Sequence, residues 1–382
     1  MTRETRTEVV IVGGGPAGLA TSACLNVLSV PNVVLEREAC TASLWKLRAY
    51  DRLKLHLAKQ FCELPHMPYP AGTPTFVPRQ QFVDYLTAYE RRFALAPVCS
   101  TLVEHAAYYE AAAEWRVTAR DVTTGELKLY RSRFLVVATG ENSQGIIPSI
   151  PGLKSFKGDV VHSSMFKSGK DYAGKRVLVV GSGNSGMEIA YDLCNHGAET
   201  SIVIRSPVHV FNKELIYLGM VLLKYLPVAV VDALLLLIAM FKYGDLSKYG
   251  IVRPTKGPFR TKLDTGMSAI IDVGTVGKIK TGEIKVIKGE IRSIKGNELE
   301  FTNGETNYYD HIVFATGFRS TAKNWLKDDD KLMDANGMPK EKAPNHWKGR
   351  NGLYCAGFMQ LGLAGVAMDA QNVANDIKKH YA

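Results

Sequence analysis

The sequence lacks closely spaced cysteine pairs. Its six cysteines stand at positions 24, 40, 62, 99, 194 and 355, and no two of them have the CxxC spacing of a redox dithiol or a zinc site. Widely separated cysteines without a secretory context are typical of reduced intracellular thiols. We therefore expect no metal site and no dithiol chemistry, which argues against a thioredoxin-reductase-like oxidoreductase.

Targeting signals and low-complexity tracts are also missing. The first ten residues, MTRETRTEVV, contain no apolar core of signal-peptide length. The net charge of +10 attracts anions, but no block of basic residues is interleaved with aromatic ones as in nucleic-acid-binding proteins. We expect a cytoplasmic protein that binds no nucleic acid. Its charge suits an anionic cofactor or substrate, but equally suits nonspecific attraction to a membrane. The sequence does not indicate an oligomeric state.

One long apolar segment is present, from Leu215 to Phe241, and it includes the run LLLLIAMF. Lys224, Pro227 and Asp232 interrupt it, and a charge at the centre of a bilayer costs at least ~2.5 kcal/mol. Three interpretations remain open: buried helices that wall a substrate cavity and place Leu235 against the substrate, a membrane-spanning helix, or a patch that associates peripherally with a membrane such as the surface of the endoplasmic reticulum.

A first nucleotide-binding motif lies near the beginning of the chain. The apolar run EVVIV predicts a buried parallel strand, and GGGPAG follows it with Gly13, Gly15 and Gly18 in GxGxxG spacing. These glycines allow a tight turn, the approach of a pyrophosphate and close packing of the next helix. Glu36 ends the following strand, where a carboxylate accepts ribose hydroxyls and repels a 2′-phosphate. The motif therefore predicts FAD or NAD, and not NADPH.

The same pattern recurs in the middle of the chain. RVLVV precedes GSGNSG, in which Gly181, Gly183 and Gly186 occupy the three glycine positions, and the next strand ends in Arg205. A guanidinium binds a phosphate with paired hydrogen bonds. The second motif therefore predicts NADPH.

Three further segments have the character of strand ends near a nucleotide. RFLVVATG ends at Gly140, HIVFATG ends at Gly317, and the tail predicts a strand, a glycine turn and a helix that starts near Gly362. The positive end of that helix dipole would face the flavin.

The segment between the two glycine motifs reads FxGxxxHxxxF, formed by Phe156, Gly158, His162 and Phe166. It resembles the FxGxxxHxxxY/F signature of class B flavin monooxygenases. The segments LHLAKQFCELP, VVATGENS, GSGNSGMEIAYDL, FATGFRS and GLAGVAMDA are similar to those of the plant YUCCA subgroup. The resemblance extends from Thr7 to Ile377.

This resemblance implies an α/β fold with two Rossmann-like dinucleotide-binding domains, the second inserted in the first. The FAD-binding domain would comprise residues 1–155 and 320–382. The NADPH-binding domain would comprise residues 156–319, with an apolar helical segment at 215–241.

The implied reaction is the oxidative decarboxylation of the 2-oxo acid indole-3-pyruvate to indole-3-acetate, the auxin, with FAD, NADPH and O₂, through an oxygen adduct at C4a of the flavin. An N- or S-hydroxylating flavin monooxygenase and a noncatalytic NADPH sensor are the alternatives.

The resemblance also suggests site residues. His56 lies where related enzymes place an asparagine beside the flavin, so His56 and the neighbouring Lys59 are the catalytic candidates, whereas His162 is expected to link the domains. The expected cofactor-binding residues are Gly13, Gly15, Pro16, Ala17, Gly18, Glu36, Trp45, Gln60, Thr139, Gly140, Gly181, Ser182, Gly183, Asn184, Ser185, Gly186, Arg205, Thr316, Gly317 and Leu361.

Overall fold

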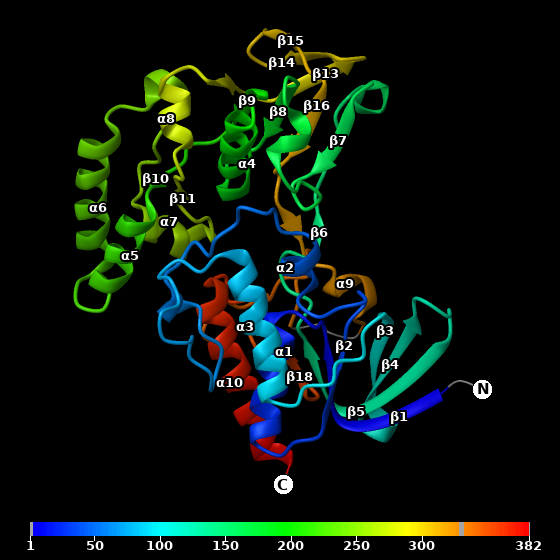
Figure 1. The fold of residues 1–382 in the computed structure, drawn as a ribbon. Coiled ribbons are helices and arrows are strands. Elements are labelled where there is room, and N and C mark those ends of the chain that lie inside the picture. Colours follow the sequence, from blue (N-terminus) through cyan, green and yellow to red (C-terminus); the bar gives the residue numbers. More distant parts are fainter. Residues whose placement is uncertain (1–2, 328–331, 382) are drawn as a thin grey trace. The chain divides into compact units, whose positions relative to one another are not determined.

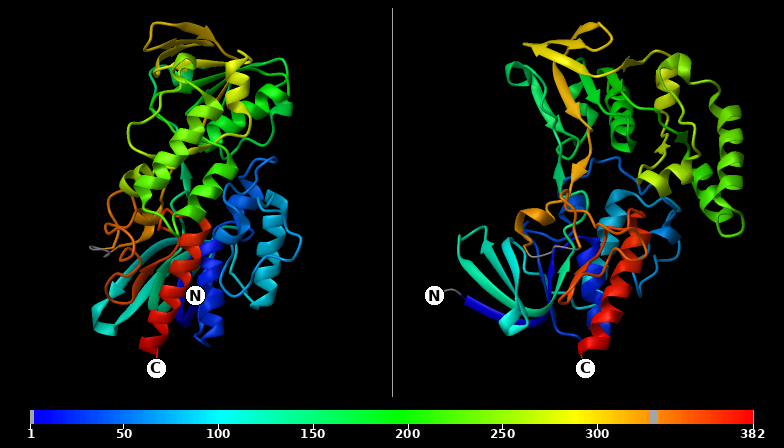
Figure 2. Two further views of the ribbon diagram at one scale, coloured as in Figure 1. Left: turned by 90° about the vertical axis from the view of Figure 1, so that its left-hand side faces the viewer. Right: turned by 180° about the vertical axis from the view of Figure 1, so that it is seen from behind.

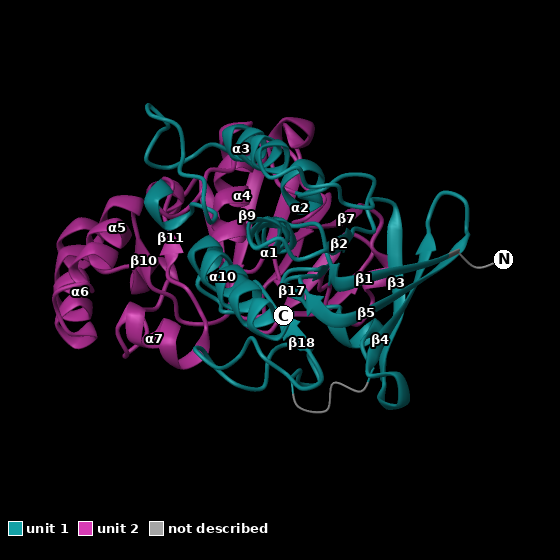
Figure 3. Cartoon of the chain, turned by 90° about the horizontal axis from the view of Figure 1, so that it is seen from below, with its two compact units in different colours: residues 1–48, 58–144, 318–382 teal, residues 49–57, 145–317 magenta. Residues whose placement is uncertain are grey.

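A computed structural model describes residues 3–327 and 332–381 (Figure 1). The chain forms two compact units, coloured separately in Figure 3. Unit 1 comprises Met1–Arg48, Ala58–Gln144 and Phe318–Ala382, and unit 2 comprises Ala49–Leu57 and Gly145–Gly317. Compared with the domain boundaries expected from the sequence, residues 145–155 and the short segment Ala49–Leu57 group with unit 2.

Unit 1 is built on a sheet whose parallel centre is fully buried. Its strands are β1 (Arg3–Val12), β2 (Asn32–Leu35), β3 (Thr101–Tyr109), β4 (Glu114–Asp121), β5 (Leu127–Val137) and β18 (Leu353–Cys355). The strand order is β2-β1-β5-β4-β3, with β18 also paired to β5. The strands β1, β2, β5 and β18 are parallel, whereas β3 and β4 extend the sheet as an antiparallel hairpin. The apolar run Val9–Val12 has almost no exposed surface, as expected for a strand covered on both faces.

Helices of unit 1 cover this sheet. They are α1 (Pro16–Val27), α2 (Ser43–Leu47), α3 (Arg79–Arg92), α9 (Ala322–Trp325) and α10 (Gly362–Tyr381). The helices α1 and α10, from opposite ends of the chain, lie side by side (Figure 2). The expected strand, glycine turn and helix of the tail are therefore present as β18 and α10, and the helix begins at Gly362 as predicted.

Unit 2 contains a second parallel sheet, in the order β12-β9-β8-β16-β7. Its strands are β7 (Asp159–His162), β8 (Arg176–Val180), β9 (Glu199–Ile204), β12 (Ile284–Lys288) and β16 (His311–Phe314). Smaller sheets are formed by β10 (Val210–Phe211) with β11 (Ile270–Ile271), and by β13 (Ile291–Lys295), β14 (Glu298–Phe301) and β15 (Thr306–Tyr308). The short strands β6 (Gln144–Gly145) and β17 (Phe318–Arg319) lie where the chain passes from one unit to the other.

The helices of unit 2 are α4 (Asn184–Asn195), α5 (Lys213–Leu222), α6 (Val228–Tyr243), α7 (Pro258–Thr265) and α8 (Thr275–Lys280). Single 3-10 turns in the two units occur at Lys59–Phe61, Glu110–Ala112, Leu153–Ser155, Gly169–Tyr172 and Ser247–Tyr249.

The apolar segment 215–241 forms α5, a turn at Pro227 and most of α6. Val231, Leu235 and Ala239, spaced four residues apart, are buried in the core of unit 2. Asp232 is also buried, and its carboxylate accepts hydrogen bonds from the backbone amides of residues 259 and 260 at 2.9 and 3.0 Å. This acid therefore stabilises the first turn of α7.

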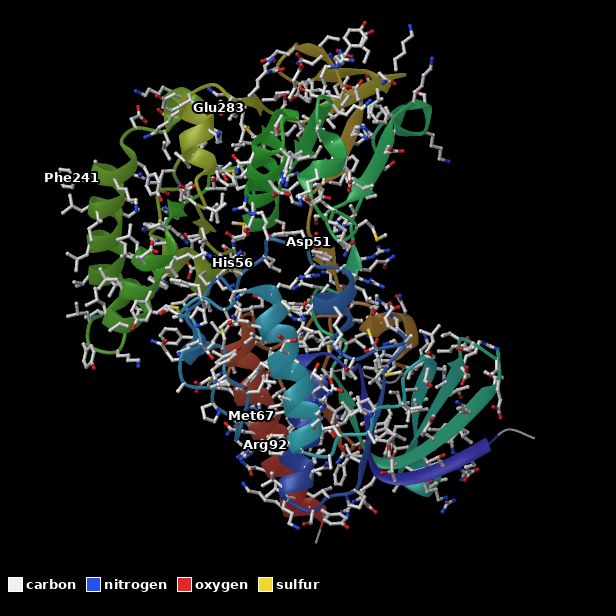
Figure 4. The ribbon with its side chains drawn as sticks, viewed as in Figure 1. Asp51, His56, Met67, Arg92, Phe241 and Glu283 are labelled. Atoms are coloured by element: carbon white, nitrogen blue, oxygen red, sulfur yellow. The ribbon has the colours of Figure 1, made fainter. Side chains whose placement is uncertain are left out.

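The opposite face of α5 and α6 is apolar and exposed. Its exposed side chains are Tyr217, Leu218, Tyr225, Leu226, Val230, Leu234, Leu237, Ile238, Met240 and Phe241, which we call the outer apolar face. Figure 4 shows Phe241 pointing away from the rest of unit 2. None of the helices in the described part of the chain is both long and apolar enough to cross a membrane.

Candidate nucleotide-binding and active site

The two glycine motifs fold into turns of the same geometry. Gly13 has φ +113° and Gly181 has φ +109°, a left-handed conformation that favours glycine. A Cβ at Gly18 would lie 1.9 Å from the carbonyl oxygen of Gly13, and a Cβ at Gly186 would lie 1.9 Å from that of Gly181. Each helix therefore crosses its turn so closely that only glycine fits.

The middle glycine of each motif has open space in front of it. A Cβ at Gly15 or Gly183 would meet no atom within 4 Å. These residues are the N-caps of α1 and α4, and neither helix has a side-chain cap. Free amides at the positive end of a helix, beside open space, are suited to a pyrophosphate. The two turns thus fit the phosphates of two dinucleotides.

Glu36 follows β2 and faces the first turn. Its side chain is buried, Oε2 accepts a hydrogen bond from the Gly14 amide at 2.7 Å, and Oε1 accepts one from the Glu38 amide at 3.0 Å. Each carboxylate oxygen has two lone pairs, so both retain capacity for a ribose hydroxyl. The carboxylate is therefore held in place beside the turn by backbone donors.

Arg205 directly follows β9, at the corresponding position in unit 2. Its guanidinium pairs with Glu290 at 3.0 Å, and the two side chains are 72% and 55% exposed. Such an exposed ion pair contributes only about 0 to 1 kcal/mol. A phosphate dianion can therefore replace Glu290 as the partner of Arg205 at little cost.

Arg205→Ala is expected to weaken NADPH binding about 10- to 100-fold, because a charge-assisted hydrogen bond to the 2′-phosphate is lost. NADH lacks this phosphate, so its affinity should change less than about twofold. Arg292→Ala is the matched control, since Arg292 is a similarly exposed arginine of unit 2 that pairs with Glu300. Titration of the purified variants with both nucleotides measures the effect, and an equal loss for NADPH and NADH would remove Arg205 from the site.

The two Ala-Thr-Gly segments follow the central strands β5 and β16. Gly140 and Gly317 have φ +75° and +86°, and a Cβ at either would meet no atom within 4 Å. The Thr139 hydroxyl is buried without a hydrogen-bond partner among the described residues, which suits an acceptor on a bound cofactor. The Thr316 hydroxyl instead donates to the carbonyl of Ile146.

His162 of the FxGxxxHxxxF segment contacts Gly145 and Gly317, the first and last residues of the long chain segment of unit 2. Its Nε2 lies 3.0 Å from the carbonyl oxygen of Gly317, and a Cβ at Gly145 would lie 2.3 Å from its Nδ1. Burial lowers the pKa of the imidazole, although the carbonyl of Gly317 acts in the opposite direction. These contacts are those of a structural residue at the points where the chain passes between the units.

His56 belongs to a cluster centred on the buried carboxylate of Glu188 in α4. Oε2 of Glu188 accepts a hydrogen bond from the Tyr50 hydroxyl at 2.9 Å and lies 3.4 Å from His56 Nε2. Arg52 Nε lies 3.5 Å from Oε1. Burial acts to raise the pKa of Glu188, but the His56 hydrogen bond and charge, with Tyr50 and Arg52, hold it below its usual value. The cluster therefore keeps an ionised carboxylate against His56, and Figure 4 labels the position of His56.

Sequence reasoning identified His56 but missed the three residues around it. Glu188 lies between the buried Met187 and Ile189, and an acid on the buried face of a helix is a signal that could have identified it, because buried charges are generally paired.

The remaining candidates lie at the starts of helices or in unit 1. Pro16 and Ala17 open α1. Ser182 precedes α4, Asn184 and Ser185 open it, and Asn184 Oδ1 accepts a hydrogen bond from the backbone amide of residue 271 at 2.7 Å, which joins α4 to β11.

Lys59 and Gln60 are in unit 1, whereas His56 is in unit 2. The Lys59 ammonium donates to the carbonyl of Thr73 at 2.7 Å, so the structure gives this lysine a structural contact and its catalytic role stays a prediction. Trp45 packs edge-on against Phe82, with ring centroids 4.6 Å apart. Leu361 is 43% exposed and directly precedes α10.

Comparison with solved structures shows the same fold in flavin monooxygenases. A flavin-containing monooxygenase from Stenotrophomonas maltophilia superposes with a TM-score of 0.73 at 21% identity, over 100% of each chain. Cyclohexanone monooxygenase from Rhodococcus sp. Phi1, solved bound to NADP⁺, has a TM-score of 0.73 at 15% identity, with 99% of this chain and 85% of the other covered. The expected α/β fold with two Rossmann-type domains is therefore confirmed.

Sequence comparison gives the family. Residues 10–217 match the family model described as pyridine nucleotide-disulphide oxidoreductase. The probable indole-3-pyruvate monooxygenase YUCCA10 of Arabidopsis thaliana is 57% identical over 372 residues, 97% of each protein. The indole-3-pyruvate monooxygenase YUCCA6 of Arabidopsis thaliana is 47% identical, over 98% of this chain and 90% of that protein. The chain therefore belongs to the YUCCA family of indole-3-pyruvate monooxygenases and is a flavin-containing monooxygenase.

Proposed function

We propose that this enzyme converts indole-3-pyruvate to indole-3-acetate, with FAD held by unit 1 and NADPH by unit 2. The observation that supports the placement of the cofactors is the pair of equivalent glycine turns, one followed by the fixed carboxylate of Glu36 and the other by the exposed guanidinium of Arg205. The substrate is the one named for relatives that share about half of the sequence or more with this chain.

The overall reaction consumes one 2-oxo acid, one O₂, one NADPH and one proton, and it yields the shortened acid, CO₂, water and NADP⁺. FAD, when bound, supplies the chemistry that takes up the hydride of NADPH and activates O₂. The protein must bind the cofactors, exclude water and manage protons. His56 is our candidate for the last task, because Glu188 engages Nε2 and leaves Nδ1 as the ring nitrogen that can hold or release a proton towards the reacting groups.

The reaction is tested with the purified, FAD-loaded enzyme. NADPH oxidation and O₂ uptake should both require indole-3-pyruvate, and chromatography should detect indole-3-acetate in matching amounts. Phenylpyruvate should react more weakly, because it keeps the 2-oxo acid but buries a smaller ring. If no arylacetic acid forms while a tertiary amine or a thioether is oxygenated, the N- or S-hydroxylating alternative replaces this proposal.

We also propose that the outer apolar face of α5 and α6 rests on the surface of an anionic membrane, such as the endoplasmic reticulum. Phe241 and Tyr225 are 85% and 78% exposed, although aromatic side chains are generally buried in soluble proteins. Lys242 and Lys224 adjoin these two aromatics in the sequence. An apolar helix face with basic residues beside it suits the boundary between acyl chains and anionic headgroups.

Flotation with vesicles of phosphatidylcholine and phosphatidylserine measures this association. The double variant Met240→Ser/Phe241→Ser should lose most of the bound fraction without loss of net charge. Val122→Ser removes an apolar side chain of unit 1 that is 51% exposed, and it should bind like the unaltered protein. A wild-type enzyme that stays in the aqueous fraction would exclude a lipid surface as the partner. A double variant that floats equally well would exclude the outer apolar face as the contact.

A further inference from the structure

An acid and a histidine form a fully buried pair in unit 1. Asp369 in α10 has no exposed side-chain surface, and the His346 side chain is 2% exposed. Nε2 of His346 lies 2.9 Å from Oδ1 of the carboxylate. In the described part of the chain, neither a lysine nor an arginine pairs with Asp369. Because a buried carboxylate needs hydrogen-bond donors, the groups that contact it show what it holds in place.

The second oxygen of Asp369 holds the chain where β18 ends. Oδ2 accepts a hydrogen bond from the backbone amide of Gly357 at 2.9 Å, and this glycine lies just after the last residue of β18. The carbonyl oxygen of His346 accepts a hydrogen bond from the thiol of Cys355, the last residue of that strand, at 3.2 Å. The pair therefore holds both the end of β18 and the turn that follows it.

The turn at Gly357 lies at the edge of the sheet that carries the first glycine motif. β18 pairs in parallel with β5, and β5 pairs in parallel with β1, so the three strands end at the same edge. Gly13 follows β1 there, and Thr139, whose buried hydroxyl has no partner among the described residues, follows β5. A Cβ at Gly357 would lie 2.8 Å from the Cβ of Ala17 in the first turn of α1. Asp369 therefore holds backbone that packs directly against the beginning of α1.

The backbone between β18 and α10 has an unusual conformation. Gly357, Gln360 and Gly362 have φ of +84°, +60° and +62°. Glutamine has a Cβ, so the left-handed conformation of Gln360 is unfavourable and persists only where surrounding contacts enforce it. Residues 357–361 therefore depend on anchors, and the hydrogen bond from Gly357 to Asp369 is the anchor at the beginning of this segment.

We propose that His346 and Asp369 are a positioning pair, which holds residues 357–361 in the conformation that binds the flavin cofactor. The inference rests on the proposed placement of FAD in unit 1. Both side chains are buried beneath the surface to which a cofactor binds, so they act through the backbone of Gly357. A bound cofactor reacts efficiently only when the groups that contact it are themselves held by a supporting layer of hydrogen bonds.

Three variants of the pair test this role. Asp369→Asn keeps the shape of the side chain but removes the charge that strengthens both hydrogen bonds, and His346→Leu leaves Oδ1 without its partner. Each should raise the Kd for FAD about 10- to 100-fold, the size expected when a charge-assisted hydrogen bond is lost. His346→Gln should stay within about twofold of the wild type, because the glutamine amide can donate to Oδ1 in place of Nε2.

Asp376→Asn is the matched control on the same helix. Asp376 lies further along α10, where it accepts a hydrogen bond from the Tyr354 hydroxyl at 2.7 Å and pairs with Lys348 at 2.7 Å. It therefore also connects α10 to β18, but within the strand and not at the turn after it. Asp376→Asn should lower the midpoint of urea unfolding and leave the Kd for FAD within about twofold of the wild type.

Two measurements on the holoenzyme separate positioning from stability, and neither depends on turnover. Fluorescence of the flavin released on dilution gives the Kd for FAD, and visible circular dichroism of the bound flavin reports how the flavin is oriented. Asp369→Asn and His346→Leu should change both, whereas His346→Gln and Asp376→Asn should change neither.

An Asp369→Asn enzyme with the wild-type Kd for FAD and the wild-type dichroism would refute the positioning role, and so would an equal loss of FAD from Asp376→Asn. If Asp369→Asn yields no folded protein, the two His346 variants decide, and equal Kd values for FAD in these two would refute the role. Weaker binding of NADPH in place of FAD would support the positioning role and refute the proposed placement of the cofactors.

Discussion

Gly15→Val is expected to yield a folded enzyme that purifies without its yellow flavin. Gly15 has φ −76° and ψ −177°, an extended conformation that valine adopts readily, and a Cβ there would touch no protein atom within 4 Å. The new side chain should therefore leave the fold intact and fill the space that a pyrophosphate needs in front of α1. We expect the affinity for FAD to fall at least about 1000-fold, because both the close approach and the amide hydrogen bonds are lost.

Absorbance near 450 nm measures bound FAD, and far-UV circular dichroism measures folding. Gly183→Val is the matched variant in unit 2, with φ −69° and ψ −177° and the same open space. It should stay yellow but resist reduction by NADPH. Gly18→Ala should fail differently, since its Cβ would collide with the Gly13 carbonyl, and little folded protein is expected. A yellow Gly15→Val beside a colourless Gly183→Val would reverse the assignment of the two cofactors.

Both nucleotide-binding turns could be predicted from the sequence because each is a local structure. A buried strand, a glycine turn and the first turn of a helix occupy about twenty consecutive residues, and the positions of the glycines follow from steric limits within that stretch. A Cβ at Gly18 or Gly186 would collide with the carbonyl oxygen of the first glycine of its motif, as expected for the glycine that lets the helix pack closely. The acid and the arginine after the second strands are equally local, so Glu36 and Arg205 lie at the ends of β2 and β9 as expected.

The surroundings of His56 could not be predicted in the same way. Glu188 follows His56 by 132 positions along the chain, and no periodicity connects them. The sequence placed His56 and Lys59 in one segment, LHLAKQ, but the structure divides that segment between two units after Leu57. Long-range packing decides which residues of this segment belong to each unit. An irregular segment has no periodic apolar face from which the sequence could indicate the unit that it packs against.

The same limit applies to charges within the apolar segment 215–241. Sequence reasoning treats Asp232 as an interruption that disfavours a membrane span. In the structure, the Asp232 carboxylate accepts hydrogen bonds from two backbone amides of α7, which follow it by 27 and 28 positions in the chain. Tertiary contacts also decide which face of α6 is buried. Both faces of this helix are apolar, so amphipathicity does not indicate the buried one.

Leu235 illustrates the consequence. Its sequence context allows a side chain that walls the substrate cavity, but in the structure it is fully buried in the core of unit 2. Its Cδ1 would lie 2.7 Å from a Cβ built at Gly219, so α6 packs closely on α5 at this glycine. Leu237, two positions further along, is 51% exposed on the outer apolar face.

Leu235→Ala is therefore expected to destabilise unit 2 by about 2 to 5 kcal/mol, through lost burial and the cavity left between α5 and α6. Leu237→Ala should change stability by less than about 0.5 kcal/mol, because its side chain is already in water. Urea unfolding followed by far-UV circular dichroism compares the midpoints of the two variants under identical FAD loading. The folded fraction of Leu235→Ala should keep the wild-type KM for indole-3-pyruvate. If its midpoint is unchanged and its KM rises, Leu235 faces the substrate after all, and the buried packing of α6 against α5 is incorrect.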